Sequence, residues 1–543
     1  MTREVRGSAD SVLTPFSPRE RRDAENLDLF SHNVSTVRHS HGGFKTSRGH
    51  LCKFGRQGLR TKADIVEKCL AVHSALRGRV SFPNSTVYQA SLESYFSAQE
   101  NSVLPQCIIS PQTTQDVAMA VQVLTAKNYM ANLPSSSCSF AIRSGGHTYF
   151  AGAANAPGGV TIDLSGLHDI TLDVSSGLVS VGSGATWGSV FSELSAANLG
   201  VNGGRSGGVG VGGLTLGGGI SFFGPRYGWT CDTVTNLEVV LGNGTIVNAN
   251  AAEHAELLWA LRGGTNNFGI VTRVQLKTFQ QGDLWGGQVV RNITTSDEQI
   301  LAIANFSDPD AYDEYASLIT TWAYDGSADL SVVVNNMEYT KPVADPPAFH
   351  TLANMSSLSS TQRITNITSL LSETDRGNPE GLRQGSATVT IDATVDAIAA
   401  AVGAWNASVP QIRNVSGIIW ALIMDILPPQ LYARHAEANA LGLEGRHNKT
   451  LIILQLTATW DLASDDDTVE VARKAVVEAI HRDVGAVGGL DAFTYVNYAA
   501  VWQTPFLGYG RASVERLRKV QQEYDPHGVF TDLVPGGFKL PRG

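Results

Sequence analysis

The sequence predicts an α+β protein with two parts, and three observations support this prediction. Segments with apolar residues at helical spacing alternate with segments of period two, so helices and strands are mixed along the chain. Two pairs of period-two segments flank short turn sequences, which indicates antiparallel hairpins. The chain has 55 glycines among 543 residues. They are more frequent before residue 281 than after it, which places a domain boundary near that point.

The first part opens with helices. Residues 63–77 predict a helix that Gly78 ends, because their apolar side chains recur at helical spacing. A second helix opens at Thr113, where Asp116 completes a capping-box pattern. A strand is expected at residues 160–164, where apolar and polar residues alternate.

Turn sequences then predict two hairpins. Strands flank Ser175-Ser-Gly177 in the first, and strands flank Asn243-Gly244 in the second. Asn-Gly is the strongest short-range hairpin signal because both residues tolerate a positive φ. Periodicity predicts further elements, namely a helix over 253–262, strands over 269–279 and 451–460, and helices over 465–484 and 513–524.

Charge and hydropathy exclude two classes of protein. The 40 basic and 50 acidic residues give a net charge of −10, and no basic stretch carries a nucleic-acid reading motif, so no nucleic-acid partner is expected. No run of 18 apolar residues occurs, so no membrane span is expected. We also expect no metal site, because no two cysteines form a Cys-X-X-Cys motif.

Cysteines and glycosylation sequons bear on the compartment. In an oxidising compartment Cys69 would pair with Cys107 or Cys138, whereas in a reducing one the five thiols would stay free. Chance gives about four Asn-X-Ser/Thr sequons, and the chain has ten. The excess favours a glycoprotein of the secretory pathway, although the N-terminal residues lack the apolar core of a signal peptide. The sequon asparagines are Asn33, Asn84, Asn243, Asn292, Asn305, Asn354, Asn366, Asn406, Asn414 and Asn448.

A dense glycine cluster is the most informative feature. Ten of the 17 residues 203–219 are glycine, which costs backbone entropy and makes sense where backbone approaches something closely. N–H groups in such loops can hold an anion such as pyrophosphate. Residues 208–213 fit the GxGxxG pattern, but Gly217-Gly-Gly219 disfavour the helix that a Rossmann turn needs. A purely structural glycine loop is the alternative.

A second cluster reads Arg143-Ser-Gly-Gly-His147. Two glycines allow a tight turn whose backbone faces a ligand, and the histidine that follows them would lie at that ligand. A structural role for His147 is the alternative when the segment is considered alone.

Together these segments resemble the FAD-linked oxidases of the vanillyl-alcohol oxidase superfamily, in the berberine-bridge-enzyme-like branch, and most closely its fungal secondary-metabolism members. The resemblance runs in order from about residue 65 to 535. The matching stretches are Pro105–Pro111, Arg143–Thr148, residues 160–164, Val209–Gly219, Tyr227-Gly-Trp-Thr-Cys-Asp232, Leu258–Val271, Tyr495-Val-Asn-Tyr498, Tyr509-Gly, Arg516-Leu and Tyr524-Asp-Pro.

The resemblance implies a PCMH-type FAD-binding fold with a substrate domain of antiparallel sheet flanked by helices. The expected domains are an N-terminal extension (1–60), an FAD-binding domain (61–280, core about 101–280), a substrate-binding domain (281–490) and a C-terminal segment (491–543) that returns to the FAD-binding domain.

The resemblance also implies FAD as cofactor, bonded through His147 to the flavin 8α-methyl carbon. Some relatives add a cysteinyl bond at the position of Ser206, so a single covalent bond is expected here. Val209 matches the residue that governs dioxygen access, and valine there resembles the oxidases. The expected cofactor contacts are Arg143, Ser144, Gly145, Gly146, His147, Val209, Gly210, Gly212, Gly213, Gly217, Gly218, Gly219, Gly269, Ile270, Val271, Asn497 and Tyr498.

By the same resemblance, Tyr495 is the candidate catalytic base and Gln455 a polar residue that supports it. A tyrosine of pKa about 10 needs such support at neutral pH. The alternatives are a buried aromatic anchor and an ordinary strand residue. The chain has Ala500 where many relatives have Asp, and no counterpart of the glutamate of berberine-forming members is evident, so alkaloid ring closure by that route is not expected.

The expected function is oxidation of an alcohol or phenolic secondary metabolite, of polyketide type, with hydride transfer to FAD and reoxidation by dioxygen. One alternative is a carbohydrate oxidase acting at the sugar C1. Another is a flavoprotein scaffold that promotes oxidative or non-redox cyclisation. The expected partners are a small-molecule substrate and dioxygen.

Overall fold

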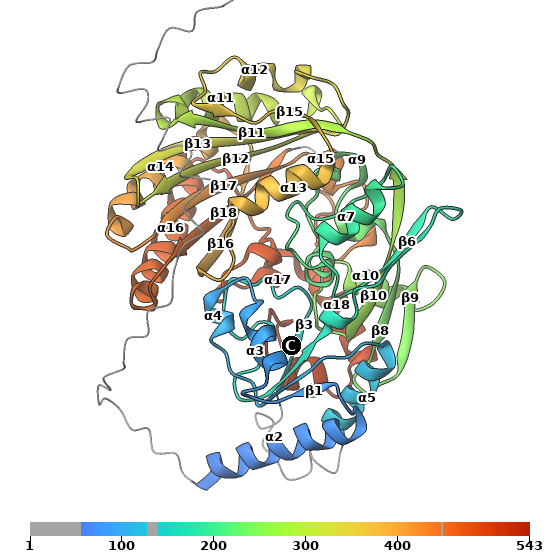
Figure 1. Cartoon of the computed structure of the whole chain (residues 1–543). Coiled ribbons are helices and arrows are strands. Elements are labelled where there is room, and N and C mark those ends of the chain that lie inside the picture. The colour runs from blue at the N-terminus through green and yellow to red at the C-terminus, as the bar shows by residue number, and fades with distance from the viewer. Residues whose placement is uncertain (1–55, 127–138, 447–448, 543) are drawn as a thin grey trace, which may run out of the picture. The chain divides into compact units, whose positions relative to one another are not determined.

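The computed structural model describes residues 56–126, 139–446 and 449–542. They lie within one compact unit, Cys52–Gly543, and are mixed helix and sheet, which confirms the predicted α+β class (Figure 1). Of the predicted N-terminal extension (1–60), residues 1–55 lie outside the described ranges. None of the helices in the described ranges is long and apolar enough to cross a membrane.

A small sheet begins the described chain. β2, β4 and β3 run parallel, and β1 is antiparallel to β2. The strand order is β1 (Val80–Ser81), β2 (Cys107–Ile109), β4 (Val160–Asp163) and β3 (Phe140–Arg143). The flanking helices are α2 (Arg56–Ala75), α3 (Thr86–Glu93), α4 (Ala98–Asn101) and α5 (Thr114–Thr125).

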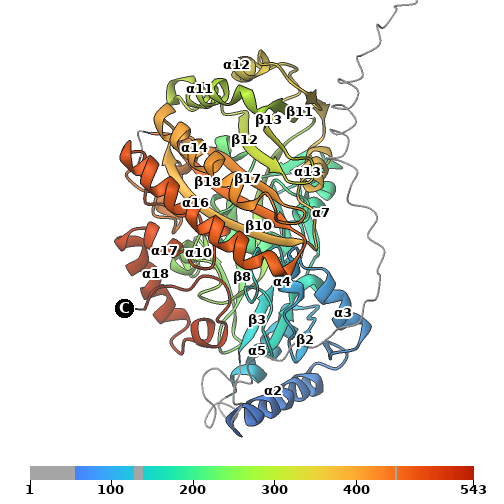
Figure 2. The ribbon, with the colours of Figure 1, turned by 90° about the vertical axis from the view of Figure 1, so that its left-hand side faces the viewer.

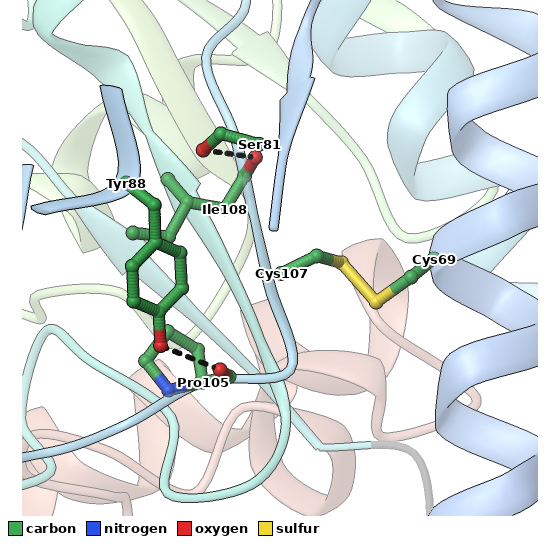
Figure 3. The surroundings of a disulfide bond; sticks show 6 residues. All are labelled: Cys69, Ser81, Tyr88, Pro105, Cys107 and Ile108. Carbon is green, nitrogen blue, oxygen red and sulfur yellow. Dashed lines mark hydrogen bonds between the residues drawn. A yellow bond between two sulfur atoms is a disulfide. The ribbon is translucent and has the colours of Figure 1, made fainter. Parts of the chain in front are cut away.

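A disulfide ties this sheet to its first helix. Cys69 of α2 is bonded to Cys107 of β2, with 6.1 Å between their Cα atoms (Figure 3). This is one of the two pairings predicted for Cys69, and Cys138 lies outside the described residues. α2 begins at Arg56, earlier than the predicted position 63. At α5 the predicted cap is confirmed, because the Thr113 side chain accepts a hydrogen bond from the N–H of Asp116.

A second sheet has six strands. Its hairpins β5–β6 and β8–β9 enclose the two predicted turn sequences, which confirms both hairpins. The order is β5 (Ile170–Asp173), β6 (Leu178–Gly182), β10 (Ile270–Gln280), β8 (Val234–Val240) and β9 (Ile246–Asn250), with β7 (Leu199–Val201) paired to β10. Its helices are α7 (Trp187–Ser195), α8 (Val211–Leu216), α9 (Gly224–Tyr227) and α10 (Ala255–Leu261).

The third sheet is antiparallel and has nine strands. β10 of the second sheet ends at Gln280 and β11 of the third begins at Leu284, so the predicted boundary near 281, which remains a prediction, falls between the sheets. The order is β14 (Ser359–Ser360), β11 (Leu284–Asn292), β13 (Leu330–Tyr339), β12 (Ala316–Asp325), β17 (Ile419–Leu427), β18 (Leu451–Trp460), β16 (Arg383–Asp392) and β19 (Leu490–Asp491), with β15 (Arg363–Thr365) paired to β11.

Helices cover one face of this sheet (Figure 2). Trp405 and Val476, from two of the helices, share a core cluster with Leu422 and Leu454 of the central strands. Because side chains alternate along a strand, Ile423 and Gln455 lie on the opposite face. The helices of this part are α11 (Ser296–Phe306), α12 (His350–Ala353), α13 (Ile367–Arg376), α14 (Val395–Ile412), α15 (Pro429–Tyr432) and α16 (Asp466–Ala486).

The C-terminal residues pack back on the second sheet's helices. α17 (Pro505–Gly508) leads into α18 (Arg511–Tyr524). Leu517 of α18 belongs to the same core cluster as Leu257 of α10, and an ion pair of 2.8 Å joins Arg516 to Glu256. The chain end therefore stabilises the part of the molecule that carries the glycine cluster.

Candidate active site

The first half of the candidate site is the turn after β3. β3 ends at Arg143, whose guanidinium donates hydrogen bonds to the carbonyls of Ser91 (2.6 Å) and Ser94 (2.8 Å). The same group lies 4.0 Å from the ring centroid of Tyr95. These contacts leave Arg143 only 4% exposed, so its side chain anchors the turn to the helices at its back.

Two glycine turns pack directly on each other. A Cβ on Gly145 would lie 2.6 Å from the Cα of Gly210, so neither position has room for a side chain. The Ser144 hydroxyl links the turns, because it donates to the carbonyl of Ser183 (2.5 Å) and accepts from the N–H of Gly212 (3.2 Å). The two turns therefore form one continuous backbone surface.

This surface presents backbone donors. Within the described ranges, the N–H groups of Gly145, Gly146, Gly208 and Gly210 donate no hydrogen bond to the protein. A Cβ on Gly213 would meet no atom within 4 Å, so space is open beside the turns. Clustered N–H groups with open space in front of them bind anions such as a pyrophosphate.

His147 closes the first turn. Its imidazole stacks on Phe96 with ring centroids 3.8 Å apart and an interplanar angle of 13°. Burial lowers the pKa of His147 to about 4, although the nearby Asp375 carboxylate partly opposes this. The ring is therefore neutral at neutral pH, and one nitrogen has a free lone pair to bond with.

The glycine stretch contains a short helix that the sequence argument did not foresee. α8 begins at Val211, inside the GxGxxG pattern, and ends where Gly217 follows. The turn is still not a Rossmann turn, because β7, the strand before it, pairs antiparallel with β10. A helix of six residues forms here because tertiary contacts override the low helix propensity of glycine.

Some glycines of the stretch are required by the protein itself. A Cβ on Gly204 would lie 2.5 Å from Trp187, and one on Gly217 would lie 2.0 Å from the Asn497 side-chain oxygen. The cluster thus serves close internal packing as well as the open surface beside Gly213.

Two tyrosines from one short segment differ in what their hydroxyl groups do. The Tyr495 hydroxyl accepts hydrogen bonds from the Gly219 N–H (3.1 Å) and the Asn497 side chain (3.0 Å). The Tyr498 hydroxyl accepts one from the Arg205 guanidinium (2.6 Å). Burial raises the pKa of both tyrosines, and Arg205 partly offsets it in each case.

Arg205 is itself held by a buried carboxylate. Its guanidinium forms two hydrogen bonds to Asp425 of β17, at 2.5 and 3.2 Å. Asp425 is 1% exposed and Arg205 14%, so water screens the pair little. Arg205 and Asp425 also line a pocket, partly open to solvent, between the glycine stretch and the third sheet.

Gln455 lies against a tyrosine other than the one predicted. Its side-chain nitrogen donates to the hydroxyls of Tyr149 (3.1 Å) and Ser386 (3.2 Å), and its hydrogen bonds within the described residues do not include Tyr495. Tyr149 lies edge-on to Phe96, the ring that stacks on His147. Gln455 therefore belongs to the His147 side of the site.

Ser206 is hydrogen-bonded to helix α13, which belongs to the part of the molecule with the nine-stranded sheet. Its hydroxyl donates to the Asp375 carboxylate (2.6 Å), which also accepts from the N–H of Gly207 (2.9 Å). Asp375 lies on α13, so this contact joins the glycine stretch to the nine-stranded part.

Known proteins resemble this chain in sequence and in fold. The FAD binding domain family matches residues 105–250. The FAD-dependent monooxygenase sdcF of Emericella nidulans is 36% identical over 87% of this chain and 98% of its own length. The FAD-dependent monooxygenase drtC of Aspergillus calidoustus is 33% identical over 90% of this chain and 92% of its own length. A protein named an oligopeptidase, from Diaporthe leptostromiformis, is 39% identical over 86% of this chain, which spans 36% of its length.

This chain belongs to the FAD-linked oxidoreductases of the vanillyl-alcohol oxidase superfamily. It is an FAD-dependent oxidoreductase of the PCMH type. Solved structures share its fold. Xylooligosaccharide oxidase from Myceliophthora thermophila has a TM-score of 0.70 at 22% identity and covers 88% of this chain and 99% of its own. Glucooligosaccharide oxidase from Acremonium strictum has a TM-score of 0.68 at 21% identity, with 85% and 97% covered.

The residues of this oxidoreductase fit its cofactor. Free N–H groups on the two turns suit a pyrophosphate, and the neutral His147 beside them suits a bond to the flavin ring. Gly269, Ile270 and Val271 lie at the start of β10, where the side chains of Ile270 and Val271 are buried in two core clusters. Only backbone atoms of these three residues are left for a cofactor contact.

Sequence reasoning missed Phe96, Tyr149, Asp375, Arg205 and Asp425. Two of them carried a signal. Arg205 is the one charged residue of the glycine stretch, and Asp425 is the one charged residue in the apolar strand Ile419–Leu427. A lone charge in an apolar strand needs a partner. Phe96 and Asp375 gave no such signal, because their partners are distant in the sequence.

Proposed function

We propose that this oxidoreductase oxidises an alcohol or phenolic secondary metabolite of polyketide type, with FAD bonded through His147 alone. The main support for this proposal is that three groups lie near one another: the turns with free N–H donors, the neutral imidazole of His147, and the Tyr498–Arg205–Asp425 set. The single bond is supported by Ser206, which stands where some relatives have cysteine and which is hydrogen-bonded to Asp375.

Bound FAD would accept a hydride from the substrate carbon and pass two electrons to dioxygen. The protein's own residues bind and polarise. The N–H groups of Gly145, Gly146 and Gly208 would hold the pyrophosphate, and Ser144 keeps the two turns together. Val209 at the edge of this surface is small, which suits access of dioxygen.

The substrate proton needs an acceptor, and two tyrosines are candidates. The sequence names Tyr495, whose hydroxyl already accepts two hydrogen bonds and steadies the turn at Gly219. Tyr498 is the stronger candidate on geometry, because the Arg205 guanidinium at 2.6 Å opposes the rise in pKa that burial causes. Asp425 keeps Arg205 oriented toward that oxygen. Gln455 would then position Tyr149 on the other side of the site.

Two phenylalanine variants separate the candidates. Tyr498→Phe should lower kcat by about 10²–10⁴-fold, the range for loss of a general base, with flavin content unchanged. Tyr495→Phe should instead lower flavin retention or thermal stability, with a smaller change in kcat. The reverse pattern would return the role of base to Tyr495.

Covalent attachment is tested on acid-precipitated protein. Flavin colour should stay with the wild-type polypeptide and be released from His147→Ala. Retention by both proteins would reveal another attachment site, and release from both would show that FAD is not covalently bound.

A monooxygenase is the second candidate, because relatives 33–36% identical carry that name. The two reactions differ in where the oxygen atoms go. An oxidase releases one hydrogen peroxide per product, whereas a monooxygenase places one atom of labelled dioxygen in the product. The carbohydrate oxidase alternative draws no support from the solved structures, since identities near 20% indicate the fold alone.

A further inference from the structure

Sequon asparagines differ in exposure from the other asparagines. Eight of the ten lie in the described ranges, and all eight are exposed. Fourteen other asparagines are described, and three of them are exposed: Asn198, Asn248 and Asn378. If the sequons had arisen by chance, their exposure would follow that of the remaining asparagines.

The side-chain nitrogens give a second contrast. Ten of the fourteen other asparagines donate a hydrogen bond through Nδ2 to another group of the protein, as Asn155, Asn202 and Asn439 do. Within the described ranges, none of the eight sequon asparagines does so. The atom that carries the sugar in an N-glycoprotein is therefore free of protein partners at every described sequon.

Local geometry at three sequons holds the amide so that Nδ2 remains available. The side-chain oxygens of Asn243 and Asn292 accept the N–H two residues later, at 2.9 and 3.0 Å. Asn366 caps α13, and its oxygen accepts the hydroxyl of Thr368, the threonine of its own sequon, at 2.8 Å. In each case the oxygen is bonded, while the nitrogen donates no hydrogen bond to the described residues.

The sequons are also unevenly placed. Six of the eight lie on the nine-stranded part and its helices: Asn292, Asn305, Asn354, Asn366, Asn406 and Asn414. The disulfide Cys69–Cys107 points to the same compartment, because disulfides persist where the surroundings are oxidising.

We propose that these exposed asparagines carry N-linked oligosaccharides and that the chain matures in the secretory pathway. The donor is a lipid-linked oligosaccharyl pyrophosphate. A bond forms between the sugar C1 and Nδ2, the bond between C1 and the phosphate oxygen breaks, and the amide loses a proton as the lipid pyrophosphate departs. No oxidant or reductant is required.

The test uses full-length protein purified from its native host. The denatured protein is treated with a peptide-N-glycosidase in heavy-oxygen water, which converts each glycosylated asparagine to labelled aspartate, and peptides are read by mass spectrometry. Label is expected at most of the eight sites. The exposed Asn198, Asn248 and Asn378, which lack a sequon, serve as internal controls and should stay unlabelled.

A variant pair checks one site without touching its asparagine. Thr368→Ser keeps the sequon and should keep the label at Asn366, while Thr368→Ala should abolish it there alone. An intact mass equal to that of the unmodified chain, or label at fewer than half of the sites, would overturn the proposal. Label at the three control positions would show that the label reports deamidation instead.

Discussion

Replacement of Arg205 by methionine is the perturbation that probes most of the site at once. The guanidinium binds Asp425 at 2.5 and 3.2 Å and donates to the Tyr498 hydroxyl at 2.6 Å. Methionine has similar volume but neither charge nor donors, so Arg205→Met leaves the Asp425 carboxylate unpaired while it is 1% exposed.

The expected cost follows from that burial. Breaking a buried ion pair from one side costs about 3–5 kcal/mol, because the remaining charge loses its partner without regaining water. Unfolding entropy is about 2.1 cal/mol/K per residue, so roughly 470 described residues correspond to about 1 kcal/mol/K if they unfold together. The melting temperature should therefore fall by about 3–5 °C.

The assay is thermal unfolding of the flavin-loaded wild type, Arg205→Met, and the double variant Arg205→Met/Asp425→Leu. Replacing both partners by apolar residues is often nearly neutral, so the double variant should recover most of the lost stability. A single variant as stable as the wild type, or a double variant as unstable as the single, would refute the account of Asp425 as a charge held by Arg205.

Three further outcomes are expected. Gly217→Ala should lower the melting temperature, because its Cβ would lie 2.0 Å from the Asn497 side-chain oxygen and displace an amide that donates to the Leu214 carbonyl and the Tyr495 hydroxyl. Gly213→Ala, with no atom within 4 Å, should keep its melting temperature but retain less FAD, and equal FAD content in Gly213→Ala and wild type would contradict the open space beside the turns. Burial raises the pKa of Asp232 to about 7 although it accepts hydrogen bonds from Asn439 and Trp229, so the folded state binds the extra proton and this group's contribution to stability falls as pH rises from about 4 to 7; urea unfolding across that range should show a flatter profile in Asp232→Asn. Reduction of the disulfide Cys69–Cys107, which joins residues 38 positions apart, should lower the free energy of unfolding by about 4 kcal/mol. Equal urea midpoints with and without reductant would contradict this.

The sequence by itself determined most of the local structure. Both hairpins follow from their turn residues, and α5 begins at Thr113 because a threonine with an acidic residue three positions later caps a helix. These features depend on neighbours within a few residues, so the local sequence is enough to predict them. The family also follows from the sequence, because its motifs occur in order along nearly the whole chain.

The tertiary structure decided which polar groups meet. Gln455 donates to Tyr149, 306 residues away, and Arg205 meets Asp425, 220 residues away. No local pattern encodes such pairs, since they depend on how three sheets are assembled. The short helix α8 has the same origin, because packing held a glycine-rich segment helical where propensity alone predicts a loop. Local chemistry could thus name His147 and the glycine turns, while the partners of each tyrosine required the assembled fold.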